Sequence, residues 1–231
     1  ASMAEPLRKL VKQYNASYDI FQGEVGCPAQ LEFAHASANL EWTEYSQAKW
    51  NLRRTIGDAV RHIPSSVFTM IDLQYTFMLQ SFGMVRSNTL KEFVYRRPSY
   101  FAMQNVFSLF DSETSPSAVT TPYAFTRSLL ADPRDTKPRT LTCAEFVRHG
   151  KPLRLYWYSD RMPSNLLEFD RVSIEIPRSL AEPVWTEMIT GRVFEIPKSD
   201  IRNENGKTVF TGIPMWDSPV MISEKESVLS R

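Results

Sequence analysis

The stretch YDIFQGEVGCP, residues 18–28, decides how the first half of the sequence is interpreted. It begins as a short run of strand-forming residues and passes into a loop rich in glycine and proline, a pattern typical of a buried strand. A second stretch, SVFTMIDL at residues 66–73, is apolar almost throughout, as a strand covered on both faces requires. We therefore predict buried strands over residues 18–24 and 66–73.

Helical patterns flank and separate these two strands. Apolar residues recur at helical spacing over residues 6–13, and again from Asn39, a predicted N-cap, until Pro64 ends the pattern. Pro98 stands at a first helical position and opens a third helix. Strands that alternate with helices favour parallel βαβ units, so we expect the two strands to be adjacent, parallel and joined by a right-handed crossover.

The composition changes near residue 111. Residues 112–140 form a proline-bearing connector, and after it come short, evenly spaced segments with the alternation and turn signals of an antiparallel β-sandwich. The sequence thus predicts an α/β segment over residues 1–111, a connector over residues 112–140 and a β-sandwich over residues 141–231. The expected sandwich strands cover residues 143–148, 153–158, 171–176, 184–189, 192–196, 208–213 and 220–223.

The overall composition excludes several classes of protein. The 231 residues carry 27 lysines and arginines against 26 aspartates and glutamates, and the resulting net charge of +1 does not predict a nucleic-acid partner. Hydrophobic residues make up 42% of the chain, which is enough for a sizeable core. No apolar run approaches the roughly 20 residues that a membrane-spanning helix needs, so we predict no membrane span.

Motifs for nucleotides and metals do not occur. Glycine is scarce, with 8 residues, and no glycine-rich phosphate loop is present, which disfavours a nucleotide-binding enzyme. Cys27 and Cys143 could pair, but neither lies at metal-ligand spacing, and the three histidines His35, His62 and His149 form no ligand set. We predict no metal site.

Polar residues gather where the two predicted strands end. Ligands of parallel α/β proteins meet the carboxyl ends of the strands, and Glu24 lies at such an end. A carboxylate there can serve as nucleophile or acid/base in glycoside hydrolysis; alternatively, it caps a loop or pairs with an arginine. The candidate substrate-binding residues near the same ends are Gln22, Gln30, His35, Asp72, Gln74 and Tyr75.

Three segments carry a family resemblance: FQGEVGCP at residues 21–28, EWTEYSQAKW at 41–50 and SSVFT at 65–69 resemble the last two βα units of a clan A (β/α)8-barrel glycoside hydrolase. The resemblance implies that Glu24 is the nucleophile of a retaining, double-displacement enzyme acting on a β-linked oligo- or polysaccharide. Such chemistry needs no cofactor and no metal. Residues 190–196 and 210–219 resemble the β-sandwich that often follows these barrels, and a secreted or periplasmic location would suit a glycan-degrading enzyme.

The sequence departs from that family at two points. Residues 71–73 replace the tryptophan that such families often have at the tip of the eighth strand. The acid/base glutamate of the fourth strand has no counterpart, and a complete barrel needs about 250 residues. The expected fold is therefore the end of a (β/α)8 barrel, incomplete in this chain, followed by an antiparallel sandwich, with the missing N-terminal barrel segment as partner. A smaller open α/β fold, or a non-catalytic carbohydrate-binding or structural module, is the alternative.

Overall fold

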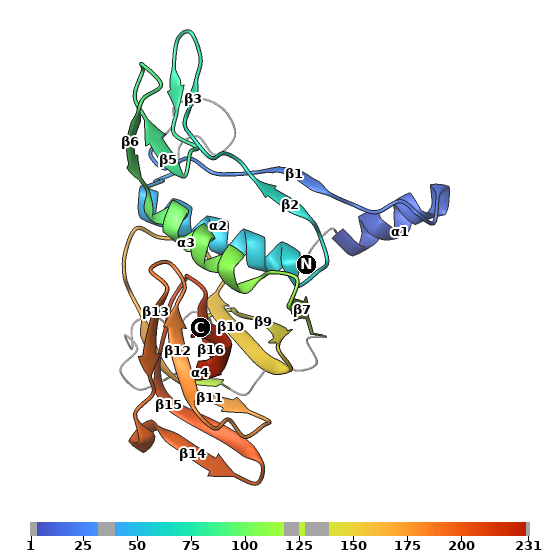
Figure 1. The fold of residues 1–231 in the computed structure, drawn as a ribbon, viewed down its shortest axis with the longest axis vertical. Coiled ribbons are helices and arrows are strands. Elements are labelled where there is room, and N and C mark those ends of the chain that lie inside the picture. The colour runs from blue at the N-terminus through green and yellow to red at the C-terminus, as the bar shows by residue number, and fades with distance from the viewer. Residues whose placement is uncertain (1–3, 32–39, 118–124, 128–138, 230–231) are drawn as a thin grey trace.

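The computed structural model describes residues 4–31, 40–117, 125–127 and 139–229. The chain is rich in β-structure and has a few helices (Figure 1). Two antiparallel sheets, one six-stranded and one four-stranded, occupy the C-terminal half of the described residues, and three two-stranded sheets lie in the N-terminal half. Helices separate the six-stranded sheet from the N-terminal strands, so the elements form successive layers along the long axis (Figure 1).

The N-terminal half contains the predicted pair of parallel strands. Gln22 pairs with Ser65 and Val25 with Val67, which confirms that the two strands are adjacent and parallel. Both strands are shorter than predicted, because the chain on either side of them turns away from the sheet. The elements of this half are α1 (Ala4–Tyr14), β1 (Gln22–Val25), α2 (Glu44–Ala59), β2 (Ser65–Val67) and α3 (Pro98–Leu109).

Helix α2 lies between the two parallel strands in sequence and packs against α3. Its N-cap is Thr43, whose hydroxyl accepts a hydrogen bond from the Ser46 backbone amide while the Ser46 side chain accepts one from the Thr43 amide. The predicted N-cap, Asn39, lies outside the described residues. The predicted apolar stripe is confirmed, since Leu52 and Ile56 are fully buried in one cluster with Met103 of α3.

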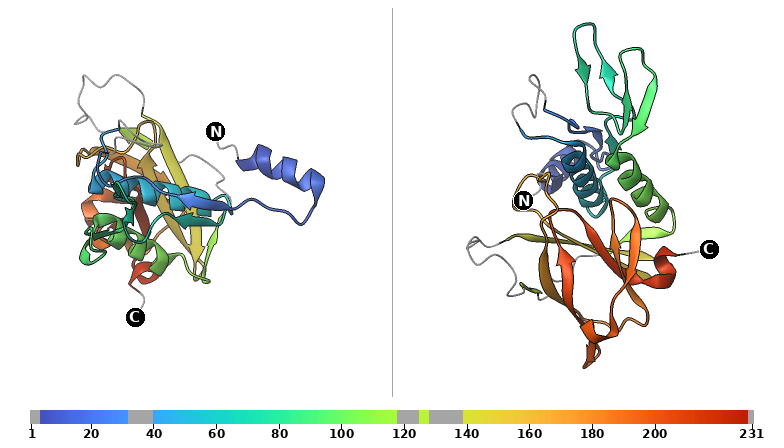
Figure 2. Two further views of the ribbon diagram at one scale, coloured as in Figure 1. Left: turned by 90° about the horizontal axis from the view of Figure 1, so that it is seen from above. Right: turned by 90° about the vertical axis from the view of Figure 1, so that its left-hand side faces the viewer.

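Between β2 and α3 the chain forms two hairpins that project away from the helices (Figure 2). The predicted strand over residues 66–73 is therefore wrong beyond Val67, because the chain leaves the parallel sheet there. The hairpin strands are β3 (Leu73–Gln74), β4 (Leu79–Gln80), β5 (Val85–Ser87) and β6 (Phe93–Arg96).

The prediction of antiparallel sheets in the C-terminal half is confirmed. In sheet order the six-stranded sheet consists of β13 (Arg192–Glu195), β12 (Pro183–Glu187), β16 (Val220–Glu224), β10 (Lys151–Tyr158), β9 (Leu141–Arg148) and β7 (Thr114–Pro116). The four-stranded sheet consists of β14 (Ile201–Glu204), β15 (Lys207–Met215), β11 (Asp170–Ile176) and β8 (Phe125–Arg127). Strands β7 and β8 both come from the predicted connector, which thus supplies an edge strand to each sheet. A 3-10 helix (Lys198–Asp200) and α4 (Lys225–Val228) complete the described elements.

The six-stranded sheet is buried on both faces, as its strand β10 illustrates. Leu155 belongs to the cluster that the sheet shares with α2 and α3, whereas its neighbour Tyr156 belongs to the cluster shared with the four-stranded sheet. Successive side chains of a strand point to opposite faces, so each face of β10 serves a different core. Phe110, at the end of α3, meets Phe146 of β9 edge-to-face at 4.5 Å between ring centroids. Aromatic side chains thus contribute to the packing of the sheet on the helices.

A buried ion pair also joins the helices to the C-terminal half. The Lys49 side chain of α2 is 0% exposed, and its ammonium lies 2.6 Å from a carboxylate oxygen of Asp217, in the β15–β16 loop. The ammonium also donates to the Leu166 carbonyl at 2.7 Å and lies 4.9 Å from the centroid of the Tyr45 ring. Burial, with the nearby carboxylates of Glu187 and Asp217, raises the pKa of Tyr45 to about 12.

Candidate functional site

The candidate nucleophile Glu24 lies at the carboxyl end of β1, in a β-bulge. From Gln22 to Val25 the chain takes three residue steps, whereas the partner strand takes two, from Ser65 to Val67. One extra residue in β1 brings Gln22 and Val25 to the same face of the sheet, although regular pleating would put them on opposite faces. The bulge thereby changes the direction in which the residues between them, including Glu24, point.

The burial of neighbouring side chains shows that Gln22 and Val25 lie on the face of the sheet that packs against the helices. Val67 packs against the α2–α3 cluster, and its partner Val25 is buried. The Gln22 side chain also lies on the helix side, because its amide oxygen Oε1 accepts a hydrogen bond from Arg54 of α2 at 3.1 Å. Glu24 is exposed, and although its backbone carbonyl accepts a hydrogen bond of 3.5 Å from the Gln22 side chain, its carboxylate forms no hydrogen bond or ion pair with any described residue. Its carboxylate is thus available on the sheet face opposite the helices.

A close approach of the two strands fixes the backbone directly after Glu24. A Cβ atom at Gly26 would lie 1.9 Å from the Phe68 carbonyl oxygen, so only glycine fits there. The Phe68 amide donates to the Val25 carbonyl at 2.8 Å, and the Phe68 ring meets Phe82 edge-to-face at 6.0 Å. An aromatic pair therefore stands at the end of β2, next to the strand that carries Glu24. The sequence shows these residues but not their proximity.

The other predicted site residues are only partly brought together. Gln30 is exposed in the loop after β1, and the Ala29 amide in that loop donates to the Ser81 carbonyl at the base of the hairpins. Gln74 and Tyr75 are exposed on the first hairpin. Gln22 faces the helices and Arg54 instead of the side of Glu24. His35 lies outside the described residues.

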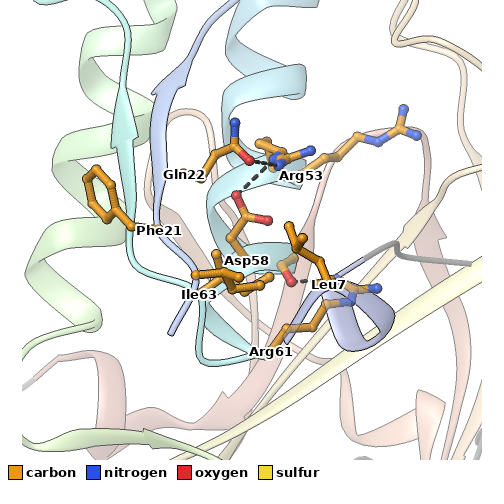
Figure 3. Close-up of a pocket in the computed structure, with 11 residues that line it drawn as sticks. Leu7, Phe21, Gln22, Arg53, Asp58, Arg61 and Ile63 are labelled. Carbon is orange, nitrogen blue, oxygen red and sulfur yellow. Dashed lines mark hydrogen bonds and ion pairs between the residues drawn. The ribbon is translucent and has the colours of Figure 1, made fainter. Parts of the chain in front are cut away.

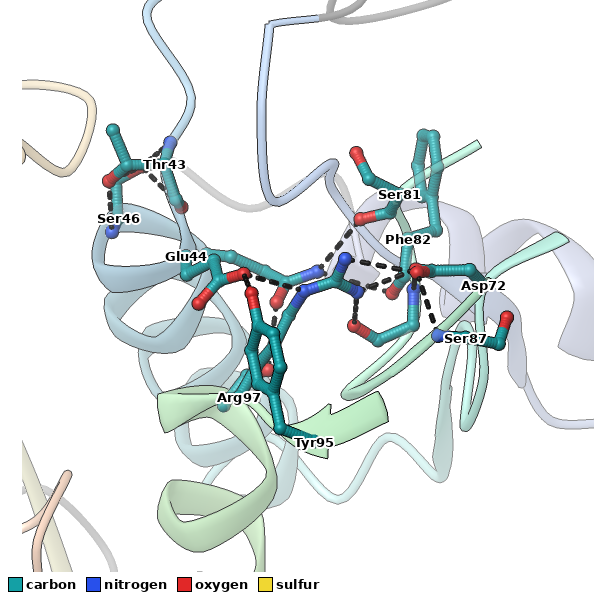
Figure 4. Close-up of polar contacts among 12 residues, drawn as sticks. Thr43, Glu44, Ser46, Asp72, Ser81, Phe82, Ser87, Tyr95 and Arg97 are labelled. Carbon is teal, nitrogen blue, oxygen red and sulfur yellow. Dashed lines mark hydrogen bonds and ion pairs between the residues drawn. The ribbon is translucent and has the colours of Figure 1, made fainter. Parts of the chain in front are cut away.

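Asp72 has a different environment from the one predicted. Its carboxylate is 0% exposed and forms two ion-pair contacts with Arg97, at 2.5 and 3.0 Å (Figure 4). It also accepts hydrogen bonds from the backbone amides of Gly83 and Ser87. These contacts occupy the carboxylate, so the geometry does not support a role of Asp72 in binding substrate. Instead it anchors the two hairpins to the body of the protein.

Arg97 is the centre of this anchor, and sequence reasoning missed it. Burial lowers the pKa of its guanidinium, but the hydrogen bonds and charges of Asp72 and Glu44 outweigh burial and raise that pKa. Glu44 of α2 lies 3.2 Å from the guanidinium and also accepts a hydrogen bond from the Tyr95 hydroxyl (Figure 4). The only signal in the sequence is an arginine directly before the helix-opening Pro98, which does not reveal its partners.

A hollow of about 520 Å³ lies between α1 and α2, on the helix side of β1 (Figure 3). Arg54 is engaged there by Asp58 at 2.8 Å, and Arg61 donates to the Gly57 carbonyl. Burial lowers the pKa of Arg53, which also lines the hollow. Because Glu24 points to the other face of the sheet, this hollow is separate from the candidate site.

Neither metal chemistry nor thiol chemistry has a visible basis in the described residues. No group of three or more potential ligands of the His, Cys, Asp and Glu types is found among them. Cys27 and Cys143 are free thiols and do not pair. Burial raises the pKa of Cys27 and raises that of Cys143 to about 12, so both stay protonated at neutral pH.

Across the part of the chain that the structure describes, no helix is long and apolar enough to span a membrane. No protein family model matches the chain, and the curated proteins give no significant match.

Proposed function

We propose that this chain is the nucleophile-bearing part of a retaining glycoside hydrolase that acts on a β-linked glycan. In this proposal β1 and β2 are the seventh and eighth strands of a clan A (β/α)8 barrel, and Glu24 is the nucleophile. The observation that carries the proposal is the bulge, which leaves Glu24 exposed on the face opposite the helices, at the carboxyl end of a parallel strand.

That position is the one in which barrel enzymes place catalytic groups. Barrel helices lie outside the strands, and the active site is built at the carboxyl ends of the strands. Bulges next to active sites serve to redirect a side chain. The carboxylate of Glu24 forms no contact with the described residues that would occupy it, whereas Asp72 is fully engaged by Arg97. Of the two predicted carboxylates, only Glu24 is therefore free to attack.

The proposed reaction needs a second carboxyl group. In the first step Glu24 would attack the anomeric carbon, the glycosidic bond would break, and the departing oxygen would take a proton from a general acid. Water, deprotonated by the same group, would then release the sugar from Glu24. Retaining enzymes hold the two carboxyl groups about 5 to 5.5 Å apart, and one carboxylate cannot perform both tasks.

We further propose that additional parallel strands complete the barrel and supply this acid, from the same or another polypeptide. Parallel sheets are normally covered on both faces. Here the helices cover one face of the β1–β2 sheet, and Phe21 beside it is 66% exposed. Helix α1 has no buried residue, and Leu7 and Leu10 are each 48% exposed. These apolar surfaces would be buried in a complete barrel.

The test compares this chain with a protein that contains the complete barrel. We expect this chain alone to be nearly inactive on aryl β-glycosides and the extended protein to be active. Glu24→Gln in the extended protein should lower kcat at least about 10³-fold, because the amide has nearly the same shape but is a poor nucleophile. The matched control is Glu204→Gln, an exposed glutamate on β14, which should leave kcat unchanged.

A mechanism-based 2-fluoroglycoside gives an independent readout. Mass spectrometry of the labelled and digested protein should locate the sugar on the peptide that contains Glu24. Labelling elsewhere, or full activity of the Glu24→Gln protein, would refute the nucleophile assignment. The second candidate function, a non-catalytic carbohydrate-binding module, is favoured by the exposed rings of Tyr75 and Phe77 and would then be preferred.

A further inference from the structure

The first hairpin, β3–β4, exposes aromatic rings in an uncharged setting. Residues 73–80 read LQYTFMLQ and contain no charged side chain. Phe77 at the tip is 82% exposed and Tyr75 is 48% exposed, although exposed aromatic clusters are uncommon on a soluble protein without a binding role. A hydrogen bond of 2.8 Å from the Tyr75 amide to the Met78 carbonyl closes the turn. We call residues 73–80 the aromatic hairpin.

The two exposed rings lie close together on the aromatic hairpin. The ring centroids of Tyr75 and Phe77 are 6.4 Å apart, and the ring planes are tilted by only 30°. Two exposed rings at this spacing can contact neighbouring units of one extended ligand. The exposed amide of Gln74 lies on the same hairpin and can donate and accept hydrogen bonds. Apolar rings with a few amide groups are typical of binding sites for polar, uncharged ligands.

The aromatic hairpin stands on a rigid base. The Asp72 carboxylate, directly before β3, binds Arg97 and the backbone amides of Gly83 and Ser87 (Figure 4). A Cβ atom at Gly83 would lie 2.3 Å from the Asp72 backbone nitrogen, so the chain is tightly packed there. A platform fixed in this way loses little conformational entropy when a ligand binds.

The aromatic hairpin also rises from the end of the sheet where Glu24 lies. After β2 the chain continues into the aromatic hairpin, and β1 runs parallel to β2. Both strands therefore point toward the hairpins (Figure 1). The loop after β1 is tied to the hairpin base by the hydrogen bond from the Ala29 amide to the Ser81 carbonyl, 2.8 Å long.

We propose that the aromatic hairpin is a binding platform for a neutral polysaccharide, in which Tyr75 and Phe77 stack on sugar rings and Gln74 bonds to their hydroxyl groups. The inference deepens the proposed function, because it makes the substrate of Glu24 an uncharged polymer instead of a short or acidic saccharide. The lack of charge on the hairpin disfavours nucleic acids and acidic glycans, which basic side chains recognise.

Native affinity electrophoresis of this chain tests the proposal without any need for hydrolysis. The gels contain mixed-linkage β-glucan, arabinoxylan or galactomannan, and a gel with polygalacturonate serves as the acidic comparison. We expect slower migration in at least one neutral gel and none in the acidic gel. Tyr75→Ala and Phe77→Ala should each weaken binding about two- to tenfold, and the double variant should migrate as in a gel without polysaccharide.

Two controls separate binding from folding and from catalysis. Phe107→Ala removes a ring of α3 that is 58% exposed, and it should migrate like the unchanged chain. Glu24→Gln should also bind normally, so a failed nucleophile assignment leaves this result intact. The thermal midpoint of the double variant should match that of the unchanged chain, because both rings are exposed. No retardation in any neutral gel, or retardation that survives the double variant, would overturn the proposal.

Discussion

The buried pair of Lys49 and Asp217 should make a large and unequal contribution to stability. Lys49 is completely buried, whereas the Asp217 side chain is 11% exposed and also accepts a hydrogen bond from the Ser164 backbone amide. Breaking a buried ion pair costs about 3–5 kcal/mol when an unpaired charge is left behind. The cost should therefore depend on which partner is removed.

Asp217→Asn leaves the ammonium of Lys49 buried, with the Leu166 carbonyl and the Tyr45 ring as its neighbours. We expect this change to lower the free energy of unfolding by about 3–5 kcal/mol. Lys49→Met leaves a carboxylate that keeps its hydrogen bond to Ser164 and some contact with water. Its cost should be smaller, about 1–3 kcal/mol. The double variant should lose less stability than the sum of the losses of the two single variants, because neither charge is then left buried without a partner.

Urea unfolding at pH 7, followed in parallel by tryptophan fluorescence and far-UV circular dichroism, measures these differences and shows whether the transition is two-state. The matched control is Lys207→Met, which breaks a pair with Glu175 of the same 2.6 Å length on the surface. An exposed pair contributes at most about 1 kcal/mol. If Asp217→Asn costs no more than Lys207→Met, the argument that the buried pair joins the helices to the sheets is wrong.

Two further predictions concern the backbone at the site and the response to acid. Gly26→Ala should lower the thermal midpoint by several degrees in a calorimetric scan, because its Cβ would meet the Phe68 carbonyl, whereas Gly23→Ala should cost less, since its Cβ would lie 3.5 Å from the Phe21 ring, an ordinary van der Waals contact. The hydrogen bond from Arg148 lowers the pKa of Asp111 below its ordinary value of 3.8, so the stabilisation is present above about pH 3.8 and is lost as pH falls through the lowered pKa. Thermal midpoints measured from pH 6 to pH 2 should therefore fall less steeply for Asp111→Asn, and an unchanged slope would contradict the assignment.

The sheets were predictable where burial follows the sequence pattern. In β11 apolar residues alternate with polar ones, and β10 is mostly apolar because each of its faces packs against a different core. Both patterns are visible in the sequence. Strand β14 was missed, because its residues IRNE are mostly exposed and acquire strand geometry only by pairing with β15. The predicted strand over residues 184–189 ends early, at Glu187, because that side chain accepts hydrogen bonds from the amides of Ile189 and Thr190 and forms a turn.

The candidate site was less predictable, because its geometry depends on contacts between distant residues. The position of Glu24 near a strand end followed from the glycine-rich loop after it, but the bulge depends on the register with β2, which is more than 40 residues away. Asp72 looked like a ligand-binding residue because it lay at the expected end of a strand. Its partner, Arg97, is 25 residues further along the chain, and no local pattern connects them.

The layered packing explains how a two-stranded parallel sheet keeps its shape. Such a pair has few contacts of its own, and isolated two-stranded sheets are marginally stable at best. Here Val67 joins the apolar cluster of α2 and α3, and the Gln47 side chain donates to the Cys27 carbonyl at 3.0 Å just after β1. The same cluster continues into the six-stranded sheet through Leu155. The β-rich half therefore stabilises the helices, and the helices in turn fix the strand that carries Glu24. It follows that variants such as Asp217→Asn should disturb the surroundings of Glu24 although they lie in the other half of the chain.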